Sequence, residues 1–229
     1  MRSQRGFVIG ILGAESTGKT VLARDLAQAL TGPTAQESAS STGLQAPRVA
    51  LVGEWLREFC EIEGRTPRVD EQAGIAAEQT RRIALAAADN DIVVTDTTAL
   101  MIAVYSEIVF GDTSLYASAE ESHRRCDLTL LTALDLPWQA DGLQRDGPHV
   151  REPVDTLVRA SLQRAASAYA VITGAGPARL EAALAAVRSA MHASTRDELA
   201  AEGSPVARWT TTCGCCGDPD CERRLFTRP

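Results

Sequence analysis

Short apolar runs alternate along the chain with longer stretches in which apolar residues recur at helical spacing. The apolar runs are typical of strands in a parallel sheet. The stretches with helical spacing are typical of the helices that cover both faces of such a sheet. We therefore predict an α/β fold with a mainly parallel sheet of about five strands. The predicted strands are residues 7–12, 48–52, 91–96, 127–131 and 169–173. The predicted helices are residues 18–30, 54–63, 70–88, 98–109, 114–125, 153–168 and 177–200.

The length of 229 residues fits one α/β domain with a small appendage. We predict the domain over residues 1–200 and a cysteine-rich tail over residues 203–229. Residues 31–47 are rich in Ser, Thr, Gly and Pro, which predicts an extended surface loop. The Ala-rich helix 177–200 is interpreted as packing surface alone.

The N-terminus resembles a signal peptide, because arginines precede the first apolar run. That run is interrupted by Gly10 and ends at Leu12, so it is too short for export or for spanning a membrane. We expect a cytoplasmic protein with no membrane partner.

The charge balance argues against one class of partner. The chain has 23 basic and 30 acidic residues, a net charge of −7 and a pI near 5.1. Binding along a nucleic acid needs clustered Lys and Arg, so we expect no nucleic-acid partner. Small polyanions need only a backbone cradle and a few cations. The sequence does not indicate an oligomeric state.

The octet GAESTGKT, residues 13–20, matches G-x-x-x-x-G-K-[ST] between an apolar strand and a helix. Glycines allow the tight turn that aims backbone N–H groups at phosphate oxygens. Lys19 is expected to reach the β and γ phosphates, and Thr20 to offer its hydroxyl to Mg²⁺. The motif predicts binding of ATP or GTP with Mg²⁺. The predicted ATP-binding residues are Gly13, Glu15, Ser16, Thr17, Gly18, Lys19, Thr20 and Val21.

Asp96 ends the apolar run DIVVTD. A carboxylate at the end of a strand beside the phosphate loop is a candidate second Mg²⁺ partner and catalytic residue. The alternative is a helix N-cap, since Asp96 stands at a strand-to-helix junction. Both roles are compatible with the sequence.

The stretch GEWLREF follows the second predicted strand. Glu54 and Arg57 stand at i and i+3, at the sheet edge where α/β proteins bind ligands. Glu54 is a candidate acceptor for the proton of an attacking hydroxyl, and Arg57 can hold the substrate. An exposed helical ion pair is the alternative. Trp55 and Trp138 are candidates for stacking on a flat ring, and core packing is the alternative for both.

Residues 134–153 combine prolines and glycines with Arg145 and Arg151. Small-molecule kinases close such lids to exclude water and to place arginines on the transferred phosphoryl group. Asp135 and Asp141 are candidates for binding substrate hydroxyls. The alternative is a surface loop with incidental arginines.

The stretches GAESTGKT, EWLREF, VVTDTTA and LLTALDLPWQADGLQRDG resemble, in order and spacing, the ribosylnicotinamide kinase domain of NadR-type proteins. The resemblance covers roughly residues 6–190. It implies the three-layer fold of P-loop kinases and transfer of the γ-phosphoryl of ATP to the 5′-hydroxyl of nicotinamide riboside. It matches Glu54 and Arg57 to the acidic residue and arginine after the second strand. Asp96 matches the acidic residue after the third strand, and Trp138 and Asp141 match the motif before the lid.

Two positions depart from that family. Gly53 stands where many members have an aromatic residue, and Gln144 where many have arginine, which leaves Arg145 or Arg151 as the lid cation. A kinase for another nucleoside or nucleotide is therefore an alternative acceptor assignment. A P-loop ATPase that acts as a nucleotide-dependent regulator is the alternative from another functional class. We expect a stand-alone kinase, without the family's other domains.

Four of the six cysteines lie in CGCCGDPDCE near the C-terminus, and Cys60 and Cys126 stand apart. Four converging thiolates can hold a tetrahedral Zn²⁺, although the spacing is not the usual pair of C-x2-C motifs. Reversible disulfide chemistry and a tail without a site are the alternatives. The candidate ligands are Cys213, Cys215, Cys216 and Cys221.

Overall fold

The computed structural model describes residues 5–32, 46–139 and 147–201, with side chains described up to residue 193. The chain divides into two compact units, Met1–Arg188 and Ser189–Pro229. The described part of the second unit is the helical stretch 189–201. The first unit contains the sheet and the candidate site residues discussed below, apart from the four C-terminal cysteines.

Five strands form one parallel sheet in the order β2-β3-β1-β4-β5. The predicted parallel sheet is confirmed, with strand bounds that differ by at most a residue from those expected. The central position of β1 explains its burial, since every residue after Phe7 in this strand is buried. The strands are β1 (Phe7–Leu12), β2 (Val49–Val52), β3 (Ile92–Asp96), β4 (Leu128–Thr132) and β5 (Tyr169–Ile172).

Helices fill the predicted gaps between strands. Three helices differ from expectation by more than one residue. A 3-10 turn precedes α4, α6 covers Tyr116–His123 rather than 114–125, and α7 begins at Arg151 and ends at Arg164 rather than covering 153–168. Pro153 is tolerated in the first turn of α7, and Ala166 has a left-handed φ of 51° just beyond its end. The elements are α1 (Lys19–Thr31), α3 (Trp55–Glu63), η1 (Val69–Glu71), α4 (Gln72–Asp89), α5 (Ala99–Phe110), α6 (Tyr116–His123), η3 (Pro148–Val150), α7 (Arg151–Arg164) and α8 (Gly176–Ala201).

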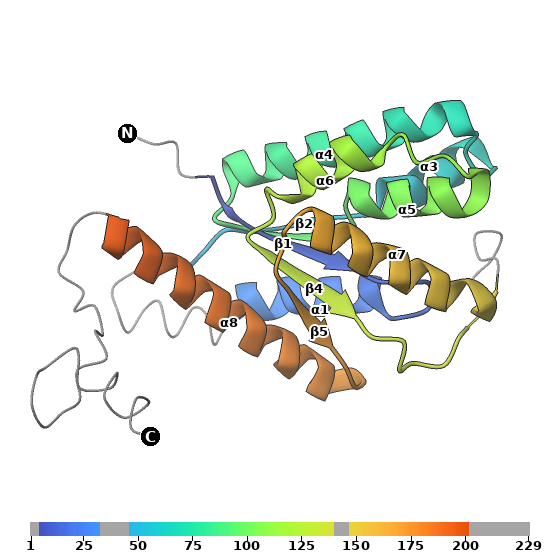
Figure 1. The fold of residues 1–229 in the computed structure, drawn as a ribbon. Coiled ribbons are helices and arrows are strands. Elements are labelled where there is room, and N and C mark those ends of the chain that lie inside the picture. The colour runs from blue at the N-terminus through green and yellow to red at the C-terminus, as the bar shows by residue number, and fades with distance from the viewer. Residues whose placement is uncertain (1–4, 33–45, 140–146, 202–229) are drawn as a thin grey trace, which may run out of the picture. The chain divides into compact units, whose positions relative to one another are not determined.

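Two apolar layers cover the sheet, one on each face (Figure 1). On one face, α1 and the first half of α8 pack on the sheet through residues such as Leu26 and Val187. On the other face, α5 and α7 pack through Leu100 and Val158, and α4 covers the β2–β3 side. The result is the three-layer α/β sandwich that the sequence predicts.

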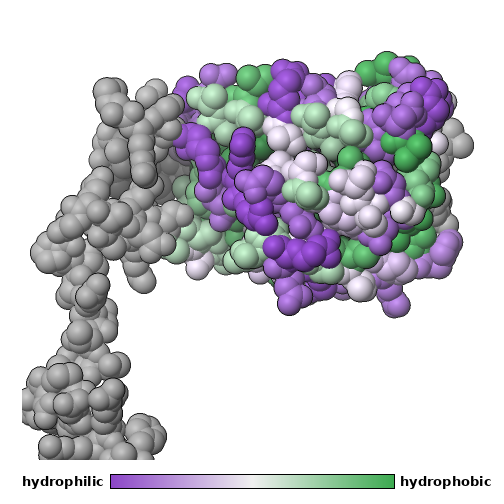
Figure 2. Space-filling view, turned by 45° about the horizontal axis from the view of Figure 1, so that its top comes forward, coloured by the Kyte–Doolittle hydropathy of each residue, from purple (hydrophilic) through white to green (hydrophobic). Residues whose placement is uncertain are grey.

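The outer face in Figure 2 carries polar and apolar residues side by side. Among the described residues, no helix combines the length and the apolar composition that crossing a bilayer requires.

The carboxyl ends of β1, β3 and β4 meet at one edge of the sheet, where the loops after these strands build the candidate site.

Candidate active site

The loop between β1 and α1 has the backbone conformation that its glycines permit. Gly13 has a φ of 147° and Gly18 a φ of 77°, both in the left-handed region that favours glycine. A Cβ at Gly13 would lie 2.1 Å from the Thr132 hydroxyl oxygen, so β4 leaves no room for a side chain there. This loop is therefore a tight strand-to-helix turn at the N-terminus of α1, as the octet predicts.

Hydrogen bonds within the chain fix this loop. The Thr17 hydroxyl donates to the Ala14 carbonyl at 2.7 Å and lies 2.7 Å from the Thr132 hydroxyl, which donates to the Leu12 carbonyl at 3.1 Å. Lys19 Nζ donates back across the loop to the Ala14 carbonyl at 2.8 Å. The buried Thr132 side chain on β4 thus contacts the loop from the sheet, and Lys19 reaches back across it.

Arg179, near the start of α8, ties three loops together. Its Nη2 donates to the Thr17 carbonyl at 2.7 Å, and its Nη1 donates to the Gly174 carbonyl at 2.5 Å and to the Asp135 carboxylate at 3.1 Å. Its side chain is only 5% exposed. The helix predicted to be packing surface alone therefore also anchors the phosphate loop, which corrects that interpretation.

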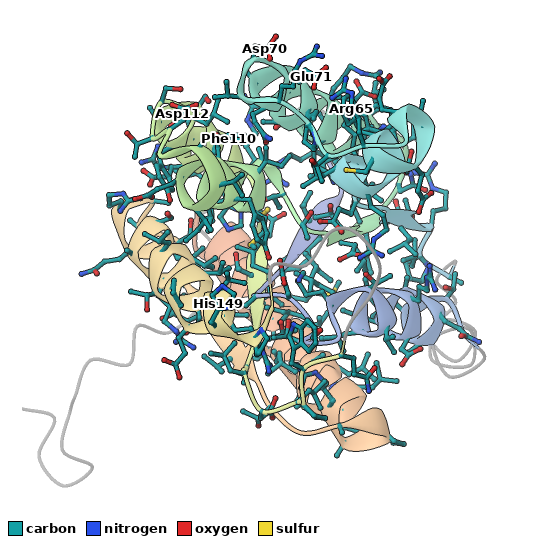
Figure 3. All side chains as sticks on the ribbon, turned by 90° about the vertical axis from the view of Figure 1, so that its right-hand side faces the viewer. Arg65, Asp70, Glu71, Phe110, Asp112 and His149 are labelled. Carbon is teal, nitrogen blue, oxygen red and sulfur yellow. The ribbon has the colours of Figure 1, made fainter. Side chains whose placement is uncertain are left out.

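One cavity of about 770 Å³ runs from this loop to the space between α3 and α5. At its nucleotide end, the lining residues come from the phosphate loop, α1 and the start of α8. At its acceptor end, they come from α3, α4 and α5; Figure 3 shows Phe110 at the end of α5 and Arg65 and Glu71 at the turn before α4. Lining residues of the acceptor end include Glu54, Leu56, Arg57, Cys60, Gln72, Met101, Tyr105 and Phe110.

Glu54 lines this cavity directly before α3. Its side chain is 17% exposed, and Arg57 Nε lies 3.5 Å from Glu54 Oε2. Burial raises the pKa of the Glu54 carboxyl, with a further rise from Asp96, whereas the charges of Lys19 and Arg57 lower it. The predicted pair of Glu54 and Arg57 thus lies in the cavity beside the phosphate-loop lysine.

Asp96 ends β3 and is 4% exposed. Within the described residues, its buried Oδ1 has no hydrogen-bond partner. The next residue, Thr97, has a left-handed φ of 69°, which is strained for a β-branched side chain. The helix after β3 is capped by Thr98, whose hydroxyl accepts from the Leu100 N–H at 3.3 Å, and this leaves Asp96 without the N-cap role. An unpaired buried carboxylate oxygen fits a Mg²⁺ partner.

Trp55 and Trp138, the two predicted stacking residues, do not line the cavity that Glu54 lines. The Trp55 ring lies under the Arg82 guanidinium at 4.0 Å and packs against a buried cluster that includes Ile75 and Ile102. Neither Trp55 nor Trp138 is among the described residues that line the cavity. Ring stacking on substrate therefore stays a prediction for both.

Of the two arginines predicted as lid cations, only Arg151 lies within the described residues. Arg151 begins α7 and is 9% exposed, and its Nε and Nη2 have no hydrogen-bond partner among the described residues. Arg145 and Asp141 lie outside the described residues, as does most of the predicted loop 31–47. Before this gap, the Ser16 hydroxyl donates to the Gln139 carbonyl at 2.8 Å, so the chain after β4 reaches the phosphate loop.

Two buried glutamines on α4 were not predicted as site residues. Gln72 is 4% exposed and lines the acceptor end of the cavity, and its buried Oε1 has no hydrogen-bond partner in the described part of the chain. Gln79 is fully buried beneath the start of α3. Both occupy the helix stripe shared by Ile75 and Ala76, and a polar residue on an apolar stripe is the signal that could have identified them.

The four cysteines proposed as Zn²⁺ ligands lie outside the described residues. Within residues 5–32, 46–139 and 147–193, no cluster of three or more His, Cys, Asp or Glu side chains could hold a metal ion. Cys60 lines the acceptor end of the cavity, and burial raises the pKa of its thiol.

The sheet order, the parallel pairing and the glycine loop with Lys19 between β1 and α1 define a kinase-like P-loop fold. The chain belongs to the AAA domain family, whose model matches residues 8–179. No curated protein sequence matches the chain.

The solved structures that share this fold include two complexes of a NadR protein. A NadR protein in complex with NR has a TM-score of 0.63 at 20% identity, over 82% of this chain and 51% of the other. A NadR protein in complex with NAD and AMP-PNP has a TM-score of 0.60 at 21% identity, over 82% of this chain and 50% of the other. This chain thus spans about half the length of those proteins.

Proposed function

We propose that this protein is an ATP-dependent kinase that phosphorylates nicotinamide riboside at its 5′-hydroxyl, giving nicotinamide mononucleotide. The observation that carries the proposal is one continuous cavity that is lined both by the phosphate loop with Lys19 and by Glu54 at the acceptor end. The resemblance of EWLREF and PWQADGL to the NadR-type kinase domain supports the same substrate.

The cavity has the size and lining that two small ligands need. Its volume of about 770 Å³ lies within the range of small-molecule and cofactor sites. Apolar side chains from α3 and α5, such as Leu56 and Met101, can cover a flat ring, while Arg57 and Gln72 offer polar contacts. A nucleotide held at the phosphate loop would point its terminal phosphate toward this end.

The phosphate loop and Glu54 would have different roles in phosphoryl transfer. The phosphate loop N–H groups and Lys19 would hold the β and γ phosphates and stabilise charge on the transferred group. Glu54 would orient the acceptor hydroxyl and take its proton as the new P–O bond forms and the bond to ADP breaks. Because burial raises the pKa of Glu54, this carboxylate is a stronger base than an exposed one.

Thr20 and Asp96 would hold the Mg²⁺ that accompanies ATP. The fit rests on the unpaired buried Oδ1 of Asp96 and on the position of Thr20 in the first turn of α1, where it lines the cavity. When bound, Mg²⁺ would neutralise part of the phosphate charge of the nucleotide.

The test is nucleoside diphosphate release by the purified protein, ADP from ATP and GDP from GTP, across a panel of nucleosides that includes nicotinamide riboside. The proposal predicts that nicotinamide riboside gives the highest kcat/KM and that nicotinamide mononucleotide appears in step with ADP. A higher value for another nucleoside would reassign the acceptor. ADP release that no acceptor stimulates would instead favour a nucleotide-dependent regulator.

A further inference from the structure

Gln79 is a polar residue at a fully buried position of α4. Its relative exposure is 0%, and its helix neighbours Ile75 and Ala76 belong to the apolar core. A buried amide without partners destabilises the fold, so a glutamine here needs hydrogen bonds that offset this cost.

The Gln79 amide finds its partners on both sides of Glu54. Its Oε1 accepts from the Trp55 backbone N–H at 2.7 Å, and its Nε2 donates to the Gly53 carbonyl at 3.2 Å. Glu54 is the residue between these two. One side chain therefore fixes the backbone immediately before and after the carboxylate that lines the cavity.

The same amide reaches the end of the neighbouring strand. Gln79 Nε2 also lies 3.3 Å from the Thr95 hydroxyl, which donates to the Thr97 carbonyl at 2.6 Å. The Thr97 N–H in turn donates to the Ile11 carbonyl at 3.1 Å, on the strand that leads into the phosphate loop. A continuous set of bonds thus joins the Glu54 backbone to the ends of β3 and β1.

We propose that Gln79 is a positioning residue that holds Glu54 in register with the phosphate loop, through its bonds to Gly53, Trp55 and Thr95. The role assigned to Glu54 rests on the proposed function. Gln79 does not line the cavity, so it acts through the backbone of Glu54 and not through substrate. Misplacing a reacting group by about 1 Å can cost on the order of 10²-fold in rate, which is the effect this tie prevents.

The first arm of the test is a double-mutant cycle with Glu54→Gln. Gln79→Met keeps side-chain length and removes all three bonds, and we expect it to lower kcat about 10- to 100-fold, with KM for ATP changed less than about twofold. In the Glu54→Gln background, the same substitution should cost less than about threefold, because the group it positions is already gone. A loss of equal size in both backgrounds would show that Gln79 acts independently of Glu54.

The matched control is Thr80→Val, on the same helix. It removes the bond from the Thr80 hydroxyl to the Ala76 carbonyl, 2.9 Å long, without touching the β2–α3 junction. Its kcat should remain within about twofold of wild type. Thr95→Val removes the contact with Gln79 Nε2 and the bond to the Thr97 carbonyl but leaves the Gln79 bonds to Gly53 and Trp55 in place, and it keeps the side-chain shape. It therefore provides a milder variant if Gln79→Met folds poorly. It should lower kcat in the same direction by a smaller factor, and an unchanged kcat would count against the tie.

The second arm needs no activity. The Trp55 backbone N–H has Gln79 Oε1 as its partner, so its hydrogen-exchange protection reports this bond directly. We expect protection at Trp55 to fall at least about tenfold in Gln79→Met and to stay unchanged in Thr80→Val. Unchanged protection in Gln79→Met would overturn the proposal whatever the acceptor is. Failure of the proposed function would appear separately, as wild-type protein that transfers phosphate to no acceptor.

Discussion

The two ends of the cavity differ in how their polar groups are satisfied. At the nucleotide end, the Thr17 hydroxyl, the Thr17 carbonyl and the Asp135 carboxylate all bond to groups of the chain itself, chiefly Thr132 and Arg179. Of the Arg179 nitrogens, Nη1 and Nη2 make these bonds, and the buried Nε has no hydrogen-bond partner among the described residues. At the acceptor end, the buried Oε1 of Gln72 has no such partner among the described residues. Phe110 is 40% exposed there although it is a large apolar side chain.

This difference separates a prebuilt site from one that a ligand completes. Phosphate is the same in every nucleotide, so a loop already fixed in place loses little conformational freedom when it binds. An acceptor is particular, and a buried polar group without a partner favours the molecule that satisfies it. Under the proposed function, the nucleotide end would set the reaction class, and the acceptor end would set which molecule reacts.

The largest expected effect comes from the phosphate end. Lys19→Ala should lower kcat/KM by at least about 10³-fold, because it removes the cation that holds the transferred phosphoryl group. Arg81→Ala, an exposed cation on α4 that pairs with Glu78, is the control and should remain near wild type. Circular dichroism and the melting temperature should match wild type in both. Turnover by Lys19→Ala within about tenfold of wild type would contradict the assignment.

Substitutions at Glu54 and Asp96 should give the second largest effect. Glu54→Gln should lower kcat by about 10²- to 10⁴-fold with little change in nucleotide affinity, since the amide keeps the shape but cannot take a proton. Asp96→Asn should instead weaken the Mg²⁺ dependence together with the rate. Glu58→Gln, on the same helix but paired with Arg82, is the matched control. If Glu54→Gln were active and Asp96→Asn inactive at saturating Mg²⁺, Asp96 would be the base.

The pH profile checks the same role. Burial raises the pKa of Glu54, so the carboxylate takes up a proton at a higher pH than an exposed glutamate would. The rate should therefore fall as the pH is lowered through that raised pKa, and recover above it. The residual rate of Glu54→Gln should lack this acidic limb.

A smaller effect should come from loosening the nucleotide end. Arg179→Met removes the donors to the Thr17 and Gly174 carbonyls and to Asp135, and should raise the Kd for ATP about tenfold while the acceptor KM changes little. Arg179→Lys, which keeps the charge but not the planar fork, should lie between. Arg188→Met, an exposed arginine on the same helix, is the control. Calorimetric titration with ATP measures the Kd of each variant. A raised acceptor KM with an unchanged Kd for ATP would contradict the assignment of Arg179 to the nucleotide end.

The smallest effect should come from the acceptor end, with opposite signs for binding and stability. Gln72→Met should raise the acceptor KM about three- to tenfold, because it removes the amide that the acceptor would satisfy. The same variant should melt at a higher temperature without ligand, since the buried Oε1 has no partner among the described residues. Gln163→Met, an exposed glutamine on α7, should change neither value. A lower melting temperature with an unchanged acceptor KM would assign Gln72 to the fold.

The sequence was informative where a structure depends on neighbouring residues. The strands are continuous apolar runs, and the phosphate loop is an octet whose glycines and lysine act together in one turn. The placement of Glu54 and Asp96 followed from a general rule, because carboxyl ends of parallel strands meet at one edge. Gln79 and Arg179 could not be placed in this way, since their partners come from strands and loops far away in the chain. The one sequence signal that could have identified them is a polar residue on an otherwise apolar face of a helix.

The lysine that reaches back across the phosphate loop has a further use. Lys19 is the only lysine in the sequence, since all the other basic side chains apart from three histidines are arginines. Reductive methylation with ¹³C-formaldehyde would therefore label one side-chain amine, together with the α-amine of the N-terminus. Its Nζ now donates to the Ala14 carbonyl, and a nucleotide phosphate would replace that partner. The methyl resonance of Lys19 would thus report nucleotide binding, with no need for site-directed labelling.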